Sequence, residues 1–142
     1  MNTELLKRAV DLTKEIGHCF IATADETGRP HIAAAGKLSY LDTDHVEITE
    51  WFCPATIANV EKNTSATIIA WDSVDDVGYQ LAGKVERVAD VAVLDGYAPE
   101  YDIEPLPQVQ RRLTLDIERV VDFKLGPHSD MELHESGSEK KK

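Results

Sequence analysis

The N-terminal segment has the pattern of an amphipathic helix. From Leu5 to Ile16, apolar side chains recur at intervals of three or four residues, the spacing of one helix face. Gly17 follows, and glycine is a common residue at the end of a helix. We therefore predict a helix that ends at Gly17 and packs one face on the rest of the molecule.

Most of the following chain has the pattern of β-strands separated by turns. Turn-forming residues fill 25–30 and 42–45, and Gly83 is a candidate β-bulge. Residues 90–110 contain three prolines and predict irregular structure, with a turn or two of helix near 91–97. The predicted strands cover residues 18–24, 31–41, 46–51, 65–71, 77–88 and 112–125. Because a six-stranded antiparallel sheet has open edges unless it closes, we predict a mainly β protein folded as a small barrel.

A short helix interrupts the strand pattern at residues 54–63. Pro54 suits the first helical position, where its missing N–H has no helical partner to lose. The unpaired first-turn amides and the positive end of the helix dipole attract anions. Thr56 adds a hydroxyl there, and Asn59 follows one turn later on the same face. This arrangement suits a phosphate, but the spacing alone favours ordinary polar residues on an exposed helix face.

Length and composition predict one domain. The chain has 142 residues, of which 42% are hydrophobic, enough for a core without disulfides. We expect the barrel to occupy residues 1–125 and a flexible tail residues 126–142. Cys19 and Cys53 have no metal-binding or redox spacing, and neither a signal peptide nor a membrane-spanning stretch is evident. A cytoplasmic location is the resulting expectation.

The net charge of −11 limits the partners that we expect. An acidic chain is repelled by nucleic acid backbones and by anionic membranes, so neither is predicted as a partner. An anionic cofactor would need a local site that overcomes this charge, and helix-start amides can form one. His128, Asp130, Glu132 and His134 alternate as potential metal ligands, but a solvated tail is the favoured interpretation, and no metal site is predicted.

Three segments resemble the FMN-binding split barrels of the pyridoxamine phosphate oxidase type. Residues 56–68 (TIANVEKNTSATI) are similar to that family's T-x-x-N-[LV]-x-x-N segment. Residues 20–31 resemble its opening hairpin, x-A-T-x-x-x-G-x-P-H, and residues 78–86 its G-[YF]-x-[LV]-x-G-x-[AV] strand. The segments occur in the family's order and span about residues 4–125, and the length is most similar to that of the small bacterial FMN-binding proteins.

The resemblance implies a split-barrel homodimer with one FMN per subunit at the interface. Thr56 would bind the phosphate, and Asn59 would support the turn or the ribityl chain. Residues 35–39 would face the flavin, and residues 51–53 would follow its edge. Ala55 departs from the many relatives that have a basic residue beside the phosphate. The implied cofactor-binding residues are Lys37, Ser39, Trp51, Phe52, Cys53, Thr56 and Asn59.

The sequence contains no evident catalytic constellation. No nucleophile–base pair or carboxylate pair stands in a recognisable arrangement, which is compatible with chemistry performed by a bound flavin. We expect a flavin-dependent oxidoreductase or electron carrier with a small-molecule redox substrate or an electron-transfer partner, and no catalytic residue is assigned. The alternative is a non-enzymatic binding module for flavin storage, haem or another planar cofactor.

Overall fold

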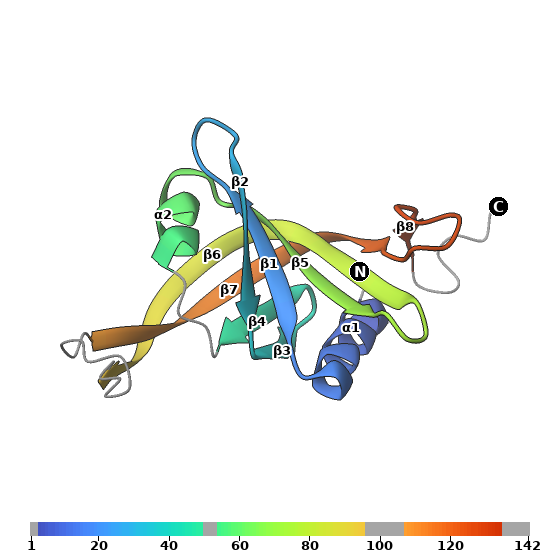
Figure 1. The fold of residues 1–142 in the computed structure, drawn as a ribbon, viewed down its shortest axis with the longest axis horizontal. Helices are drawn as coiled ribbons and strands as arrows, with labels where there is room; N and C mark the ends of the chain where they lie inside the picture. The colour runs from blue at the N-terminus through green and yellow to red at the C-terminus, as the bar shows by residue number, and fades with distance from the viewer. Residues whose placement is uncertain (1–2, 50–53, 96–106, 135–142) are drawn as a thin grey trace.

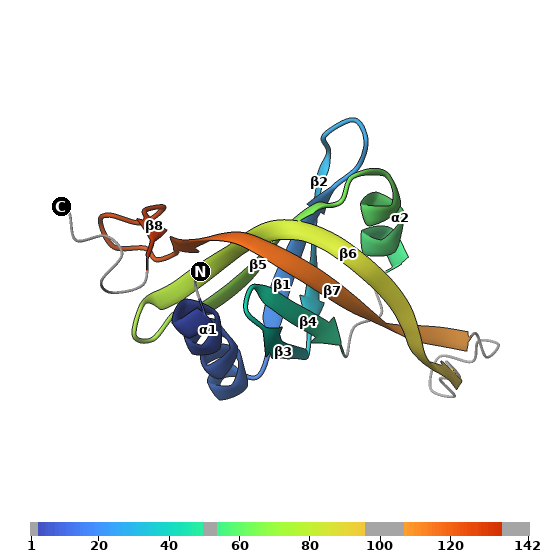
Figure 2. The ribbon, with the colours of Figure 1, turned by 180° about the vertical axis from the view of Figure 1, so that it is seen from behind.

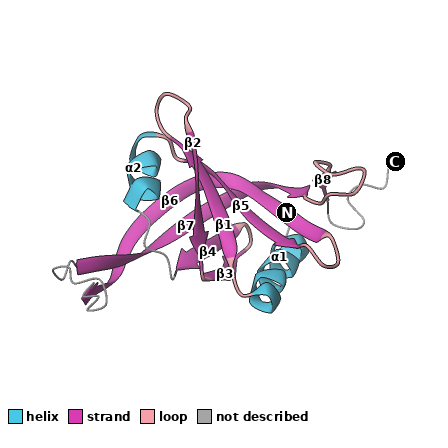
Figure 3. Ribbon diagram, in the orientation of Figure 1, coloured by secondary structure: helices cyan, strands magenta, loops and turns pink. Residues whose placement is uncertain are grey.

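The computed structural model describes residues 3–49, 54–95 and 107–134, which form two helices and eight strands (Figures 1 and 3). Helix α1 spans Thr3–Ile16, and α2 spans Pro54–Lys62. The strands are β1 (Cys19–Ala24), β2 (Pro30–Ala35), β3 (Lys37–Asp42), β4 (His45–Thr49), β5 (Ser65–Asp72), β6 (Val77–Asp95), β7 (Pro107–Asp122) and β8 (Glu132–Leu133).

The strands form one antiparallel sheet whose two end strands are neighbours in the sequence. Their order is β2-β1-β5-β6-β7-β4-β3, with β8 paired to β7. The two ends of this path, β2 and β3, are consecutive in the chain and are separated only by Gly36. The predicted mainly β, antiparallel barrel is therefore confirmed, with two corrections. The predicted strand 31–41 is divided at Gly36, because β2 pairs with β1 whereas β3 pairs with β4, and β8 is an additional strand.

Strands β6 and β7 are longer than the sequence pattern predicts. They pair from Tyr79–Asp122 as far as Asp95–Pro107, so the irregular segment predicted over 90–110 is wrong at both of its ends. Proline is tolerated at the first residue of a strand, which is the position of Pro107. Figures 1 and 2 show this pair as a curved ribbon that reaches beyond the other strands.

Close backbone contact explains the glycine in the middle of β6. The register shifts between Ala82 and Gly83, where the sequence predicts a bulge. A Cβ atom added to Gly83 would collide with the carbonyl oxygen of Asp116 and would lie 2.8 Å from Ile117 Cα. Only a residue without a side chain therefore allows β6 and β7 to approach here.

Helix α1 packs its predicted apolar face on the sheet. Leu5, Leu6, Ala9 and Val10 are buried in the same core as the inward-facing strand residues. The main partners of the helix are β3, β5 and β6. The helix ends as predicted at Gly17, whose φ is 87°. α1 thus fixes one side of β3, the strand that carries two of the predicted cofactor-binding residues.

Asp76 connects the β5–β6 turn to the C-terminal segment. Its carboxylate accepts hydrogen bonds from the indole N–H of Trp71 at 3.0 Å, the amide of Leu125 at 2.8 Å and the amide of Gly126 at 2.9 Å. These bonds hold the pKa of Asp76 below its ordinary value, with the Leu125 amide making the largest contribution. Together with β8, they connect Leu125, Gly126 and residues 132–133 to the sheet.

Candidate functional site

The start of α2 has free hydrogen-bonding capacity. Pro54 and Ala55 are exposed, whereas Thr56 and Val60 form the buried face of the helix. Among the described residues, none outside the helix forms a hydrogen bond with the amides of Ala55 or Thr56. The hydroxyl Oγ1 of Thr56 is buried and has no hydrogen-bond partner in the described part of the chain. This helix start therefore combines unpaired amides with an unpaired buried hydroxyl.

Asn59 joins this helix to the barrel. Its Nδ2 donates a hydrogen bond of 3.0 Å to Oγ1 of Thr23, a buried residue of β1. The main packing partners of α2 are β1 and β2. Asn59 thus positions the helix start on the sheet, and its amide nitrogen is already engaged. The sequence pattern missed Thr23, because this partner lies 36 residues away and nothing local marks the contact.

Lys37 and Ser39 lie in a different place, on β3 against α1. They line a groove of about 470 Å³ together with Lys7 and Lys14 of α1. Within 3–49, 54–95 and 107–134, no hydrogen bond or ion pair joins Lys37 or Ser39 to α2. The described contacts therefore do not bring the two halves of the predicted cofactor site together. The remaining predicted residues, Trp51, Phe52 and Cys53, lie outside the described residues.

The electrostatics at the start of α2 come from backbone groups and neutral side chains. Its first turn has no acidic residue, and its one basic residue in the last turn is Lys62. An anion at the helix start would thus interact with amide dipoles, not with a formal charge on the helix. Cys19 lies within the described residues and is inert, because burial raises the pKa of its thiol to about 12.

A family model for pyridoxamine 5'-phosphate oxidase matches residues 5–122, most of the chain. The chain belongs to the pyridoxamine 5'-phosphate oxidase family. This assignment confirms the resemblance drawn from the three sequence segments, and it covers all of the strands except β8. No curated protein matches the sequence. No described helix is both long enough and apolar enough to cross a membrane.

Solved structures of low sequence identity share this family's fold with the chain. An FMN-binding protein from Syntrophomonas wolfei is 17% identical, with a TM-score of 0.62 over 89% of this chain and 90% of that one. HupZ from Group A Streptococcus is 19% identical, with a TM-score of 0.60 over 87% and 97%. A pyridoxamine 5'-phosphate oxidase-related, FMN-binding protein from Nostoc punctiforme is 13% identical, with a TM-score of 0.60 over 89% and 87%. At these identities the similarity establishes the fold.

Proposed function

We propose that this protein is a flavoprotein that binds FMN through the start of α2. The observation that carries the proposal is the unpaired, buried Thr56 hydroxyl beside free first-turn amides, in a chain of this family. Burying a hydroxyl without a hydrogen-bond partner costs free energy of folding, and an oxygen atom of a ligand would provide that partner. Two structural relatives are FMN-binding proteins, which supports the same cofactor here.

The residues at the helix start fit the phosphate end of FMN. The amides of Ala55 and Thr56 and the Thr56 hydroxyl would hold the phosphate, and Asn59 would keep the helix on β1 through Thr23. Bound FMN would supply redox chemistry at its isoalloxazine ring. The chain's own residues would bind and orient it, and the protein would act as an oxidoreductase or electron carrier toward a small redox substrate or partner.

A homodimer is part of the proposal, and an exposed apolar surface supports it. Phe20 on β1 and Ile32 on β2 keep 38% and 62% of their surface exposed. They lie on neighbouring strands, where Phe20 is opposite Ala34 and Ala22 is opposite Ile32. All four residues point to the outer side of the sheet, because they alternate with buried ones. A second subunit would cover this surface, as apolar patches of this kind favour association.

Comparing FMN with riboflavin tests the proposal, since riboflavin lacks only the phosphate. Each hydrogen bond to a charged group contributes about 1.5–3 kcal/mol, so we expect FMN to bind at least about tenfold more tightly. The assay is quenching of flavin fluorescence by the purified, unliganded protein, preceded by an absorption spectrum of the protein as isolated. Equal affinities for FMN and riboflavin would show that the protein has no binding site for the phosphate. Failure to bind FMN at micromolar concentration would refute the proposal. A haem absorption spectrum of the protein as isolated would mean that its cofactor is haem and not FMN.

A further inference from the structure

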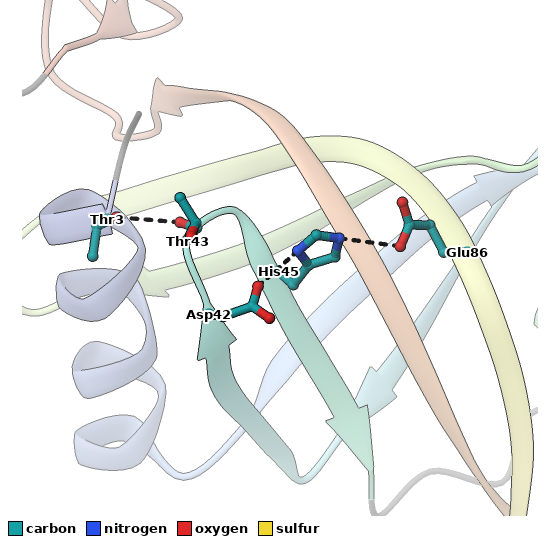
Figure 4. Close-up of polar contacts among 5 residues, drawn as sticks. All are labelled: Thr3, Asp42, Thr43, His45 and Glu86. Carbon is teal, nitrogen blue, oxygen red and sulfur yellow. Dashed lines mark hydrogen bonds and ion pairs between the residues drawn. The ribbon is translucent and has the colours of Figure 1, made fainter.

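A histidine lies between carboxylates at the joint of β3 and β4. His45 Nδ1 lies 2.8 Å from Oδ1 of Asp42, and His45 Nε2 lies 3.1 Å from Oε1 of Glu86 (Figure 4). Asp116 completes the group: one potential ligand atom each from His45, Glu86 and Asp116 lie within 4.8 Å of one another. The two nitrogens of one imidazole thus contact the carboxylates of Asp42 and Glu86, and Asp116 adds a third carboxylate close by.

Strand pairing explains how residues so distant in sequence meet. His45 begins β4 directly opposite Asp116 of β7, and β6 pairs with the other side of β7. The β6–β7 register shifts between Val85 and Arg87, so Glu86 is the additional residue of a bulge. Bulges redirect side chains, and this one lets Glu86 reach across β7 to His45. Three adjacent strands therefore each provide one potential ligand.

The cluster borders an open cavity. A cavity of about 300 Å³ is lined by Asp42 and His45 and also by Glu47, Arg87 and Arg112. Arg112 is paired with Glu47, with 3.3 Å between Nε and Oε2. Arg87 is the other cationic residue of the lining, and the carboxylates of Asp42, Glu86 and Asp116 lie around His45. The cavity also leaves space for solvent or a small anion beside His45.

We propose that His45, Glu86 and Asp116 bind a divalent transition metal ion, with Zn²⁺ as the expected ion and Asp42 as a positioning residue. One imidazole nitrogen and two carboxylate oxygens suit Zn²⁺, which often has three protein ligands and one open position. Mg²⁺ and Ca²⁺ prefer oxygen ligands only. Asp42 on Nδ1 forms the carboxylate–histidine contact that commonly orients a metal-binding imidazole.

The ligand spacing is close to that of a metal site. Bond lengths near 2.1 Å and tetrahedral angles place neighbouring ligand atoms about 3.4 Å apart. The 3.1 Å between His45 Nε2 and Glu86 Oε1 is near this value. Other pairs, at up to 4.8 Å, need only a side-chain adjustment at a surface where Glu86 is half exposed.

Zinc titration of the full, untagged chain tests the site. After dialysis against a chelator, isothermal titration calorimetry with ZnCl₂ should show one site of micromolar or higher affinity. H45Q should weaken binding by about 100-fold or more, since removing even an outer partner of a ligand costs about 10–100-fold. D42N should weaken it by about 10–100-fold, and D42E should recover part of the loss because a carboxylate still faces Nδ1.

The matched control removes the two histidines that alternate with acidic residues in the C-terminal segment. His128 and His134 lie in the C-terminal segment, and the double variant H128Q/H134Q should bind Zn²⁺ as the wild type does. Should H45Q fail to fold, imidazole ¹H–¹⁵N spectra of the control variant can report Zn²⁺ binding at His45. Zn²⁺ should shift the Nε2 signal of His45. No binding by the wild type, undiminished binding by folded H45Q, or loss of binding in the control would each overturn the proposal.

Discussion

Two buried threonines allow the same substitution to be tested with opposite expected outcomes. Thr56 on α2 has none of its surface exposed, and its hydroxyl has no partner among the described residues. Thr23 on β1 is 4% exposed, and its hydroxyl accepts the hydrogen bond from Asn59 Nδ2. Valine has nearly the shape of threonine but lacks the hydroxyl, so Thr56→Val and Thr23→Val separate packing from hydrogen bonding.

The expected magnitudes come from the desolvation of these groups. A buried polar group without a partner costs about 1–3 kcal/mol, so Thr56→Val should raise the free energy of unfolding of the unliganded protein by about 1–2 kcal/mol. For a chain of this size that is about 3 °C in Tm per kcal/mol. Thr23→Val leaves Asn59 Nδ2 unpaired at the α2–β1 contact and should lower the free energy of unfolding by about 1–3 kcal/mol.

The assay combines urea unfolding, followed by circular dichroism, with FMN titration. We expect Thr56→Val to be more stable than the wild type yet to bind FMN at least about tenfold more weakly, since it loses one hydrogen bond to the phosphate. Lower stability of unliganded Thr56→Val would mean that the hydroxyl has a partner. Unchanged FMN affinity would place the phosphate elsewhere, whatever the effect on stability.

Three further substitutions or titrations test the fold. Gly83→Ala should lower the free energy of unfolding by about 3 kcal/mol or more, because the new Cβ meets the backbone of β7, and wild-type stability in urea would refute that close approach. In a Cys53→Ser background, Cys19 should react with a thiol reagent at pH 8 only after unfolding, since its pKa is about 12; rapid labelling of the folded protein would contradict this. Asp76, whose folded pKa is lowered by amide and indole donors, should stabilise the fold above its ordinary pKa and lose that effect as pH falls through the lowered value. Trp71 fluorescence should report the loss in the wild type but not in Asp76→Asn.

Local patterns were sufficient to predict those helices and strands in which the spacing of apolar residues matches the side that faces the core. The helix from Leu5 to Ile16 and the alternating strands both follow from which side chains face the core. The division at Gly36 could not be predicted in this way. The small residues 33–36 are compatible with one continuous strand. The segment is two strands because β2 pairs with β1 whereas β3 pairs with β4. These strand pairings depend on how the whole sheet closes, which a local sequence pattern does not contain.

The candidate site shows the same limit. Pro54 correctly marks the start of α2, because its effect on the helix is local. The burial of Thr56 depends on the packing of α2 against β1 and β2, and the Asn59–Thr23 bond depends on that packing too. The proposed ligands around His45 come from three strands and a bulge, and they are 30 or more residues apart. Sequence spacing therefore contained no signal for it.

The two proposed sites bind ligands of opposite charge in a chain with net charge −11. They share no residue: one uses α2 and β1, and the other uses β4, β6, β7 and the end of β3. Within the described residues, no hydrogen bond joins α2 or Thr23 to the residues around His45. We therefore expect long-range electrostatics to be the main coupling, and salt at physiological strength screens charges more than about 8 Å apart. Saturating Zn²⁺ should thus leave FMN affinity unchanged within about twofold at physiological salt. A larger change that persists at high salt would show that the barrel itself transmits a conformational change between the sites, contrary to this view of two independent ligand sites.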